Sequence, residues 1–515
     1  MRSERLASAL VVALSSAFAG CAPTRGDLLA DGPQSYFIAP DGDDANPGTQ
    51  VAPWKTFAHA LPMLRPGLSL VLLDGVYTSA TSGMLQVFCG TNAMDGTPDR
   101  PIAVRAQNER RAFLQGDGGG APIELSACAN WVVEGLRAEG ADLASEMGDE
   151  PGSLVVLTHG CTNVLARRLV AAHPNRYLQA SAYVVAHAAE NVVIEESEAL
   201  DYHYYGFHAY DSMHPVFRRD YAHSRDVADL PGGMATVDPL RGDGGFLLTK
   251  STNALIENCI AEHTADGFTI VGSHVVVGGR VQPQHDQILG CIANDTTSAG
   301  FHLESRCAST KPCEQGDHIV SDSLLSNDVA RGGAVGFLGG GGVRLQLESG
   351  SVFDVTDAGV SFGVVAENLG LTSSAFARQT LVSAPGLAVG FRATGQADWR
   401  FQSCNAFGAT TPYAPRDARV DVARTADPLL GGCLVTIPPG SPMATAGTGM
   451  SRIGARIVNR TEDGKETMTK LWDPVTGAFP CGATVNGLND AARADVSCIG
   501  VHTRLNVGVN GCAIP

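Results

Sequence analysis

The sequence predicts an all-β chain that folds as a right-handed parallel β-helix, with a short helix capping its N-terminal end and an irregular C-terminal segment. The chain has 515 residues, of which 60 are glycines. Charged residues make up only 17% of the chain. Short apolar runs separated by turn residues are typical of stacked β-coils. Two sequence markers also recur at the spacing of one coil. Each coil of such a solenoid packs only on its neighbours, so one body can extend over most of the chain.

The first marker is an asparagine that precedes a strand-like run. Asn130, Asn163, Asn191 and Asn253 each stand before residues rich in Val, Leu and Ile, and they follow one another after 33, 28 and 62 residues. The last interval fits two coils. Asparagine amides stacked at the same turn can hydrogen-bond along the column, so the repeat predicts an asparagine ladder.

The second marker is the dipeptide Gly-Phe, whose phenylalanines are expected to stack inside the coils. It occurs at residues 206–207, 245–246, 267–268, 300–301, 336–337 and 390–391. Because successive side chains of a strand point to opposite faces, the first and third residues after each phenylalanine should point outward. One outward column then contains His208, Leu247, Thr269 and His302, and the other contains Tyr210, Thr249, Val271 and Glu304.

The N-terminus has the features of an export signal. Arg2 and Arg5 precede an apolar run over residues 6–18, which is too short to span a bilayer and is typical of a signal peptide over residues 1–20. The sequence Ala19-Gly20-Cys21 resembles the lipobox of bacterial lipoproteins, which implies lipidation of Cys21; an ordinary signal peptide cut nearby is the alternative. Residues 21–35 are expected to be a flexible tether. The protein is therefore expected to be exported and held in the cell envelope, contacting the membrane only through this lipid.

Residues 36–420 are predicted to form the β-helix. Pro53 and Thr56 suit the start of a short helix and Pro66-Gly67 suits its exit. A helix here would cover the open end of the stack. With Asn46-Pro47-Gly48-Thr49, Pro53-Trp54-Lys55-Thr56 and Gly75-Val76-Tyr77, this stretch resembles the N-terminal segment of bacterial β-helix proteins of the pectate-lyase-like superfamily. The resemblance implies the fold but not the activity, because that superfamily includes lyases, hydrolases, epimerases and non-enzymatic surface proteins.

The cysteines suit an oxidising compartment. Thirteen are present, and twelve remain if Cys21 carries lipid. Cys307 and Cys313 bracket a short polar loop and are the first predicted disulfide. Two further pairs share repeat positions, Cys128 with Cys161 and Cys259 with Cys291, and each pair could be a disulfide or two buried thiols. Residues 421–515 are expected to be strands and loops pinned by disulfides among Cys433, Cys481, Cys498 and Cys512.

The candidate site lies where polar residues are densest, between residues 201 and 304. Stacking is expected to bring five of them toward one face: Asp211, Asp243, Lys250, Asp266 and His302. Lys250 beside Asp211 has the ingredients for β-elimination, because a partly desolvated lysine can take the proton next to a uronate carboxylate. His208 and His302 are candidate acid–base groups. Arg218, or Ca²⁺ bound by Asp211, Asp243 and Asp266, would stabilise the developing negative charge.

Simpler interpretations of the same residues stay open. Asp211 and Lys250 suit a structural ion pair, the Asp-Gly sequences suit ordinary turns, and the two histidines suit surface aromatics. The formal net charge of −17 argues against a nucleic acid partner. The sequence thus predicts a monomeric exported protein that acts on a polysaccharide, preferably a lyase on an acidic glycan. The alternative is a non-catalytic surface lipoprotein that binds glycan or protein through its β-helix face.

Overall fold

The computed structural model describes most of the chain from Ser35 to Leu471. The described residues are 35–92, 94–117, 120–141, 150–175, 178–225, 243–272, 275–277, 280–282, 285–305, 320, 322–340, 344–363, 374–395, 398–414, 419–431 and 434–471. The predicted signal peptide, the tether, the lipidation site Cys21, the Cys307–Cys313 disulfide and the C-terminal disulfides lie outside these residues and stay predictions. In the described part of the chain, no helix is long and apolar enough to cross a membrane.

Three long parallel sheets form the body of the molecule. The first sheet contains β1 (Ser35–Ile38), β2 (Ser69–Leu72), β5 (Ile102–Ala106), β8 (Ala129–Glu134), β11 (Thr162–Arg167), β14 (Val193–Glu195), β17 (Val216–Arg218), β20 (Leu255–Glu257), β25 (Gln287–Leu289), β28 (Leu324–Ser326), β31 (Leu345–Glu348), β34 (Ser374–Arg378), β37 (Asp398–Gln402) and β40 (Arg419–Asp421). The second contains β3 (Gly75–Thr78), β6 (Ala112–Gln115), β9 (Arg137–Glu139), β12 (Val170–Ala172), β15 (Glu198–Tyr202), β18 (Tyr221–Ser224), β21 (Ile260–Glu262), β26 (Ile292–Thr296), β29 (Val329–Gly332), β32 (Ser351–Phe353), β35 (Leu381–Ser383) and β38 (Asn405–Phe407). The third contains β4 (Leu85–Phe88), β7 (Ile123–Ser126), β10 (Val155–Thr158), β13 (Tyr183–Ala186), β16 (Tyr205–Tyr210), β19 (Gly244–Thr249), β22 (Asp266–Val271), β27 (Ala299–Glu304), β30 (Val335–Gly340), β33 (Ala358–Gly363), β36 (Val389–Ala393) and β39 (Thr411–Ala414).

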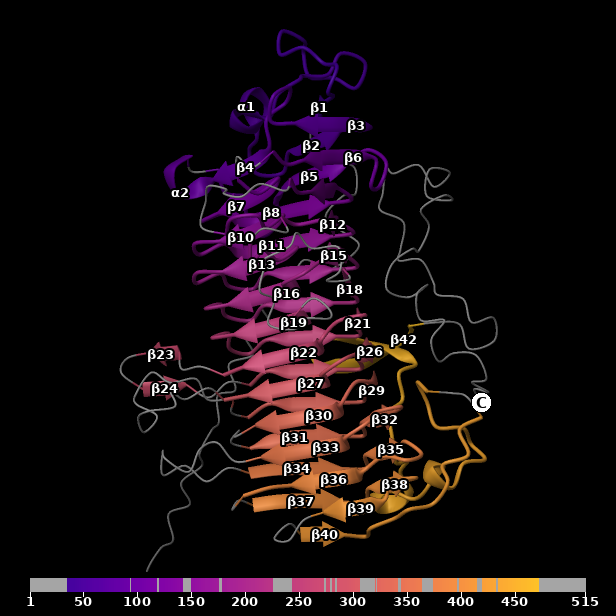
Figure 1. Ribbon diagram of the computed structural model, residues 1–515. Coiled ribbons are helices and arrows are strands. Elements are labelled where there is room, and N and C mark those ends of the chain that lie inside the picture. Colours follow the sequence, from indigo (N-terminus) through magenta and orange to yellow (C-terminus); the bar gives the residue numbers. More distant parts are fainter. Residues whose placement is uncertain are drawn as a thin grey trace, which may run out of the picture.

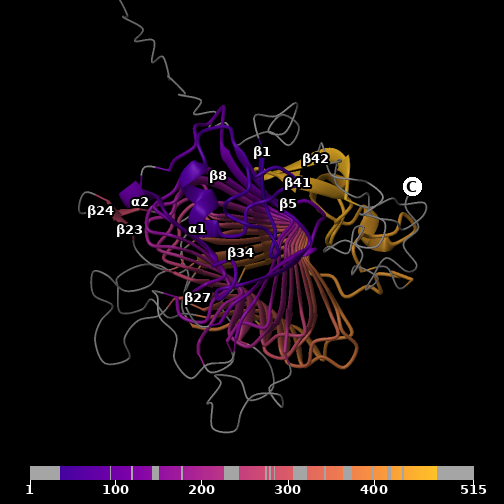
Figure 2. The same cartoon turned by 90° about the horizontal axis from the view of Figure 1, so that it is seen from above.

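The chain visits the three sheets in turn, so each coil stacks on the one before it (Figure 1). Seen along the stack, the coils enclose one core (Figure 2). Antiparallel pairs occur in two hairpins of the described chain, β23 (Val275–Val277) with β24 (Arg280–Gln282), and β41 (Asn459–Glu462) with β42 (Lys465–Lys470). The predicted parallel β-helix is confirmed. Its hand follows the prediction, since parallel crossovers are right-handed in nearly all proteins.

A short helix caps the N-terminal end as predicted. Helix α1 (Phe57–Ala60) begins after Thr56, whose hydroxyl accepts a hydrogen bond from the backbone N–H of His59 at 3.1 Å. A 3₁₀ turn, η1 (Leu61–Met63), continues it. Phe57 and Leu61 are buried in the same core cluster as the first strands, so the helix closes the apolar end of the stack. The other short helical elements are α2 (Cys89–Asn92), η4 (Pro442–Ala444) and η5 (Thr448–Met450).

The predicted phenylalanine stack fills the core beneath the third sheet. Phe207, Phe246, Phe268, Phe301 and Phe337 lie one above the other, with successive ring centroids 4.8 to 4.9 Å apart and nearly parallel planes. This spacing equals the separation of neighbouring strands, so each ring from Phe207 to Phe301 contacts the rings of both adjacent coils, whereas Phe337 is followed by Val360. The Gly-Phe repeat therefore predicted both the inward direction and the register.

The four repeated asparagines share one column. The feature that explains the repeat is not the predicted hydrogen-bonded ladder. A single amide-to-amide hydrogen bond joins them in the described chain, from Asn163 Nδ2 to Asn130 Oδ1 at 3.4 Å. All four have a positive φ between 52° and 58°, and His214 fills the same position in the coil between Asn191 and Asn253. Asparagine tolerates this left-handed conformation better than most residues. The repeat thus marks a backbone turn rather than a hydrogen-bonded ladder.

One disulfide is present in the described chain, and it joins Cys89 of α2 to Cys128. Cys161, which the sequence placed at the same repeat position as Cys128, is a buried free thiol. Cys259 and Cys291 are also buried free thiols. The disulfide therefore ties the loop after β4 to the turn before β8, rather than joining two stacked cysteines.

Residues 434–471 pack against the outer face of the second sheet. An outward apolar row contributes Tyr221, Ile260, Ile292, Val329, Phe353 and Leu381, and the C-terminal segment covers it with Val435, Met443, Ile453, Ala455, Ile457, Val458 and Leu471. Figure 1 shows this segment alongside the lower coils. Burial of this apolar surface holds the segment on the stack.

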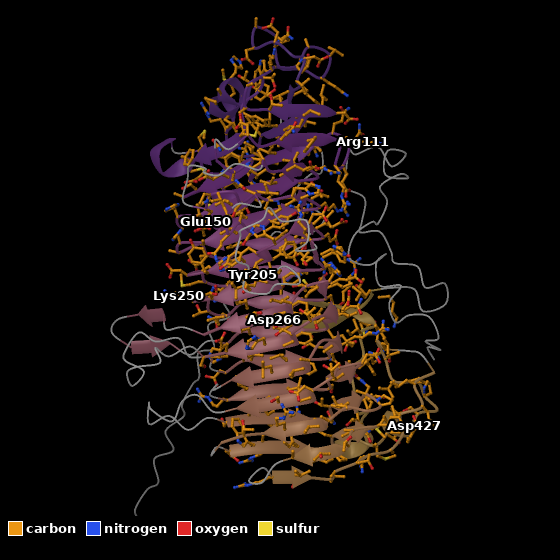
Figure 3. All side chains as sticks on the ribbon, in the orientation of Figure 1. Arg111, Glu150, Tyr205, Lys250, Asp266 and Asp427 are labelled. Carbon is orange, nitrogen blue, oxygen red and sulfur yellow. A yellow bond between two sulfur atoms is a disulfide. The ribbon has the colours of Figure 1, made fainter. Side chains whose placement is uncertain are left out.

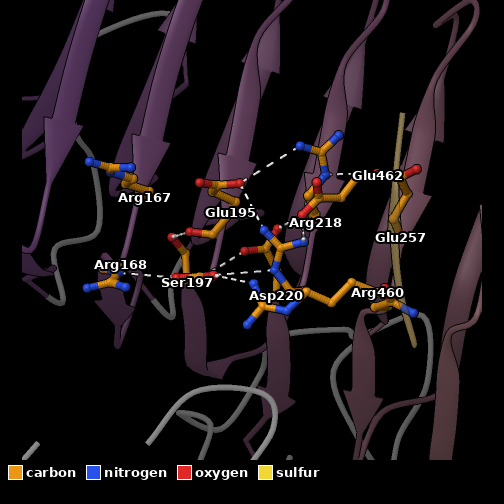
Figure 4. A network of polar contacts seen from close by, with 12 residues as sticks. Arg167, Arg168, Glu195, Ser197, Arg218, Asp220, Glu257, Arg460 and Glu462 are labelled. Atoms are coloured by element: carbon orange, nitrogen blue, oxygen red, sulfur yellow. Dashed lines mark hydrogen bonds and ion pairs between the residues drawn. The ribbon is translucent and has the colours of Figure 1, made fainter. Parts of the chain in front are cut away.

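A network of charges joins the same segment to the first sheet (Figure 4). Arg105, Glu134, Arg167, Glu195, Arg218 and Glu257 are partners in register on six successive strands, so their charges alternate along the stack. The C-terminal hairpin extends this network, because Asp463 Oδ1 lies 2.6 Å from a guanidinium nitrogen of Arg218 and Glu462 contacts the buried Arg219 at 3.5 Å. Buried charges are tolerated where they are paired in this way.

Asp286 is a buried acid at the turn before β25. Its Oδ1 accepts a hydrogen bond from the backbone N–H of Ala254 at 2.9 Å, and its side chain is fully buried. Burial raises the pKa of this carboxyl to about 7. An unfolded aspartate titrates near a pKa of about 3.9, so between these values the folded protein binds a proton that the unfolded chain does not. Asp286 therefore makes the free energy of unfolding decrease as the pH rises from about 4 to 7.

We expect Asp286→Asn to reduce this decrease, because asparagine keeps the acceptor for Ala254 and does not ionise. Urea unfolding of the wild type and the variant between pH 4 and 7 measures the difference. Asp427→Asn is the matched control, since that exposed carboxylate also accepts a backbone N–H, from Leu429 at 2.9 Å. Parallel pH profiles for wild type and Asp286→Asn would contradict the assignment.

Candidate active site on the third sheet

The outer face of the third sheet carries the residues that the register placed there. His208, Leu247, Thr269 and His302 are partners on β16, β19, β22 and β27. Tyr210, Thr249, Val271 and Glu304 are partners in the second outward column. Both predicted columns are confirmed. The face is therefore an ordered surface on which side-chain positions repeat about every 4.8 Å along the stack.

Asp266 and His302 form a hydrogen-bonded pair on this face. Asp266 Oδ2 lies 2.8 Å from His302 Nδ1, and Oδ1 accepts the backbone N–H of Ala299 at 2.9 Å. Both carboxylate oxygens are thus engaged, and the bond to Nδ1 fixes the orientation of the imidazole. With the proton on Nδ1, Nε2 is the basic nitrogen. The side chains keep 17% and 21% of their surface exposed, so solvent reaches the pair.

Tyr205 lies in the same column as Asp266, two strands away. Gly244 separates them, because it pairs with Tyr205 on one side and with Asp266 on the other. A Cβ atom at Gly244 would lie 2.6 Å from Cε1 of Tyr205, so the glycine leaves the space that the phenol ring occupies. The ring thus leans along the stack toward Asp266. Figure 3 shows Tyr205 and Asp266 near each other on the front of the molecule.

His208 lies among tyrosine rings on β16. Its ring centroid is 5.1 Å from that of Tyr210 and 5.8 Å from that of Tyr205. Loss of hydration lowers the pKa of the His208 imidazole to about 4. His208 is therefore uncharged at neutral pH and adds an aromatic, polar but neutral surface to the face.

Asp211 and Lys250 occupy equivalent turns at the ends of β16 and β19, as the register predicted. Both have a positive φ, 47° and 53°, and the backbone N–H of Asp211 donates to Thr249 O at 3.0 Å. Their side chains are exposed and form no ion pair with each other in the described chain. Figure 3 shows Lys250 at the left edge of the face. Six residues of strand separate this edge from the Asp266 end, which is about 20 Å.

The three aspartates predicted to bind Ca²⁺ do not share one site. Asp243 and Asp266 are on adjacent coils, where the backbone N–H of Asp266 donates to Asp243 O at 3.1 Å, but Asp211 lies at the opposite end of the strands. Asp266 uses both oxygens for His302 and Ala299. Among the described residues, no three His, Cys, Asp or Glu side chains converge as metal ligands. These aspartates therefore do not fit a common calcium site.

Arg218 is on a different sheet from the other candidates. It ends β17 in the first sheet, and its guanidinium lies 2.8 Å from Glu257 and 2.6 Å from Asp463. The role predicted for Arg218, stabilising charge at the site of Lys250, His208 and His302, does not fit its place on the first sheet. Its contacts make it part of the charge network that holds the C-terminal hairpin (Figure 4).

A second polar cluster on this face was not predicted. Tyr210 contacts both Glu150 and His187, and His159 stacks on His187 with ring centroids 5.0 Å apart. The sequence contains a signal for the two histidines, since each follows a strand of the third sheet at the position that Asp211 and Lys250 occupy in later coils. Glu150 comes from the segment before β10, which has no repeat position to predict it.

Comparisons with known proteins reveal a likeness of fold. No protein-family model and no curated protein matches the chain. Among solved structures, pectate lyase Pel9A is 14% identical, with 82% of this chain and 97% of that chain covered and a TM-score of 0.43. The A-module of mannuronan C-5 epimerase AlgE6 from Azotobacter vinelandii is 12% identical. The match covers 70% of this chain and 91% of that chain, with a TM-score of 0.41. The GH136 lacto-N-biosidase from Eubacterium ramulus is 12% identical. The match covers 76% of this chain and 68% of that chain, with a TM-score of 0.41.

The three parallel sheets themselves define the fold of this chain as a parallel β-helix. The fold implied by the sequence resemblance is thus the fold observed in this chain. The reaction has to be argued from the site itself.

Proposed function

We propose that this chain is an exported carbohydrate-active enzyme that cleaves a uronate-containing glycan by β-elimination on the outer face of the third sheet. The observation that carries the proposal is the Asp266–His302 hydrogen bond, with Tyr205 in the same column as Asp266 two strands away. An imidazole oriented by a carboxylate is a general base, and a neighbouring phenol is a proton donor. The predicted lipid on Cys21 would hold the enzyme at the cell envelope.

The proposed step moves one proton and breaks one bond. His302 Nε2 takes the proton from C5 of the uronate, and the electron pair left behind forms the C4–C5 double bond. The C4–O bond breaks, and the Tyr205 hydroxyl protonates the leaving oxygen. Transfer of the proton from His302 to the Tyr205 phenolate restores the enzyme. Water is not consumed, and the products are an unsaturated uronate end and a new reducing end.

Elimination fits this site better than hydrolysis. Most glycosidases use two carboxyl groups, one as acid and one as base or nucleophile. Here Asp266 directs both of its oxygens to Ala299 and His302. The groups aimed at the surface are then an imidazole and a phenol, which transfer protons without a second carboxylate.

The surroundings of the pair support a sugar ligand. His208 and the adjacent Tyr205 supply ring faces for the C–H groups of a sugar. The stacked coils repeat these positions along an extended surface, which suits a linear chain.

The test is an ultraviolet assay for the unsaturated product on a panel of uronate polysaccharides, with neutral glucans as controls. We expect absorbance to increase with one or more uronates and with none of the neutral glucans. Parallel reactions with calcium and with a chelator test the predicted calcium requirement. Reducing ends released without the unsaturated product would assign hydrolysis instead. Saturable glycan binding with no product of either kind would support the non-catalytic alternative.

A further inference from the structure

Three possible metal-ligand atoms converge where the strands of the third sheet end. Tyr205 lies at the other end of these strands, at the start of β16. The Tyr210 hydroxyl hydrogen-bonds to Glu150 Oε1 and lies 2.6 Å from His187 Nε2. Glu150 Oε1 and His187 Nε2 are 3.6 Å apart. The three residues come from the segment before β10, the turn after β13 and the end of β16. A carboxylate, a phenol and an imidazole nitrogen therefore meet at one point on the surface.

The fold orients the imidazole toward this point. His187 has a φ of 53°, the turn conformation that His159 adopts one coil earlier with a φ of 52°. The two imidazole planes are stacked at 25°, and His159 Nδ1 lies 3.4 Å from the Ser126 hydroxyl. On the other side the Tyr210 ring meets His187 edge-on, with centroids 4.9 Å apart. The His187 ring is thus held between two aromatic neighbours with Nε2 directed at Glu150 and Tyr210.

We propose that Glu150, His187 and Tyr210 bind a borderline divalent cation, with Zn²⁺ as the reference ion. Tetrahedral ligands at about 2.1 Å from zinc lie about 3.4 Å from one another. The separation of 3.6 Å between Glu150 Oε1 and His187 Nε2 already matches this. The Tyr210 oxygen reaches its ligand position by withdrawing about 1 Å, and a water molecule would be the fourth ligand.

The donor set selects the class of ion. Calcium takes six to eight oxygen ligands, whereas a mixed nitrogen and oxygen set suits zinc and related transition metals. On binding, the Tyr210 O–H bond breaks, the oxygen bonds to the metal and the proton leaves to the solvent. No oxidant or other reactant is needed. The site lies about 17 Å along β16 from Tyr205, so it stands or fails separately from the proposed elimination.

The test measures metal binding directly. The full-length protein is freed of metal with a chelator and titrated with Zn²⁺ by calorimetry, and Co²⁺ is added in parallel for its visible absorption. We expect one equivalent of Zn²⁺ to bind and a Co²⁺ spectrum of four- or five-coordinate form. His187→Ala and Tyr210→Phe should each weaken Zn²⁺ binding by at least about 10-fold. Tyr210→Phe removes the ligand oxygen and keeps the ring that packs on His187.

The matched control is His263→Ala, because His263 also pairs with a carboxylate, Asp295 at 3.0 Å, but lies in the turn between β21 and β22, before the third sheet begins. It should leave Zn²⁺ binding unchanged. Equal loss in His263→Ala, or Zn²⁺ binding by wild type no stronger than by His187→Ala, overturns the proposal. If circular dichroism shows that His187→Ala does not fold, Tyr210→Phe decides alone. A Tyr210→Phe variant that melts lower in chelator but binds Zn²⁺ as wild type does would also overturn it.

Discussion

His302→Ala is expected to lower turnover of the uronate substrate by about 10²- to 10⁴-fold, the usual contribution of a general base. The loss follows because no other imidazole is oriented by Asp266, whose Oδ2 lies 2.8 Å from His302 Nδ1. Turnover is measured by the rate of ultraviolet absorbance at saturating substrate. Binding of the glycan should change much less than the rate, since the proton is transferred only in the transition state.

Two further variants test the assignment of His302. Asp266→Asn keeps an oxygen for the Ala299 N–H but removes the charge that stabilises the protonated imidazole, so it should be slow as well. His59→Ala removes an imidazole in the capping helix α1 at the N-terminal end of the stack, and it should retain the wild-type rate. A His302→Ala enzyme that turns over normally would exclude this base and return attention to Lys250 or His208.

Phe268→Ala is expected to destabilise the protein by about 3–5 kcal/mol, the usual cost of removing a buried phenylalanine. Its ring stacks on Phe246 and Phe301, with both centroid distances 4.9 Å, and its side chain is fully buried. The change therefore leaves a cavity and removes two ring contacts. Urea unfolding measures the loss, and amide hydrogen exchange of β19, β22 and β27 locates it, because long solenoids need not unfold in two states.

Phe88→Ala is the matched control for the stack. Phe88 also belongs to a strand of the third sheet, but it is the last residue of that strand and keeps 45% of its surface exposed. Its loss should cost less than about 1 kcal/mol. Equal effects of the two substitutions, or faster exchange that is confined to strands far from β22, would contradict the role of the stack.

The sequence was sufficient for the body of the fold because each coil repeats the same physical problem. Every Gly-Phe places a ring inside and a small residue at a close approach: a Cβ at Gly267 would lie 2.4 Å from the backbone oxygen of Gly300. This pattern determines register, and register determines which residues face outward. The turn asparagines were recognised for the same reason, although the backbone conformation rather than amide pairing explains them.

The site was predicted less well. The register of the strands shows which residues stack in one column, but not which side chains of different columns contact each other. His302 and Asp266 were each named, one as an acid–base group and one as a metal ligand. Their pairing depends on how a side chain leans between neighbouring strands, which the repeat does not encode. Tyr205 takes its position from the empty space over Gly244, and Glu150 reaches the face from outside the repeat. The structural role of Arg218 was not predicted, because its partner Asp463 lies 245 residues later in the chain and outside the repeat.

The C-terminal segment determines when the molecule is complete. The outward row from Tyr221 to Leu381 is covered by residues that begin at Val435, so the stack can be fully formed while this row is still bare. A chain truncated before residue 434 contains every coil but still exposes this apolar row on the outer face of the second sheet. Such stripes are what chaperones and proteases bind in unfinished proteins. Whether residues 434–471 are present therefore decides whether this apolar row is buried or exposed to chaperones and proteases.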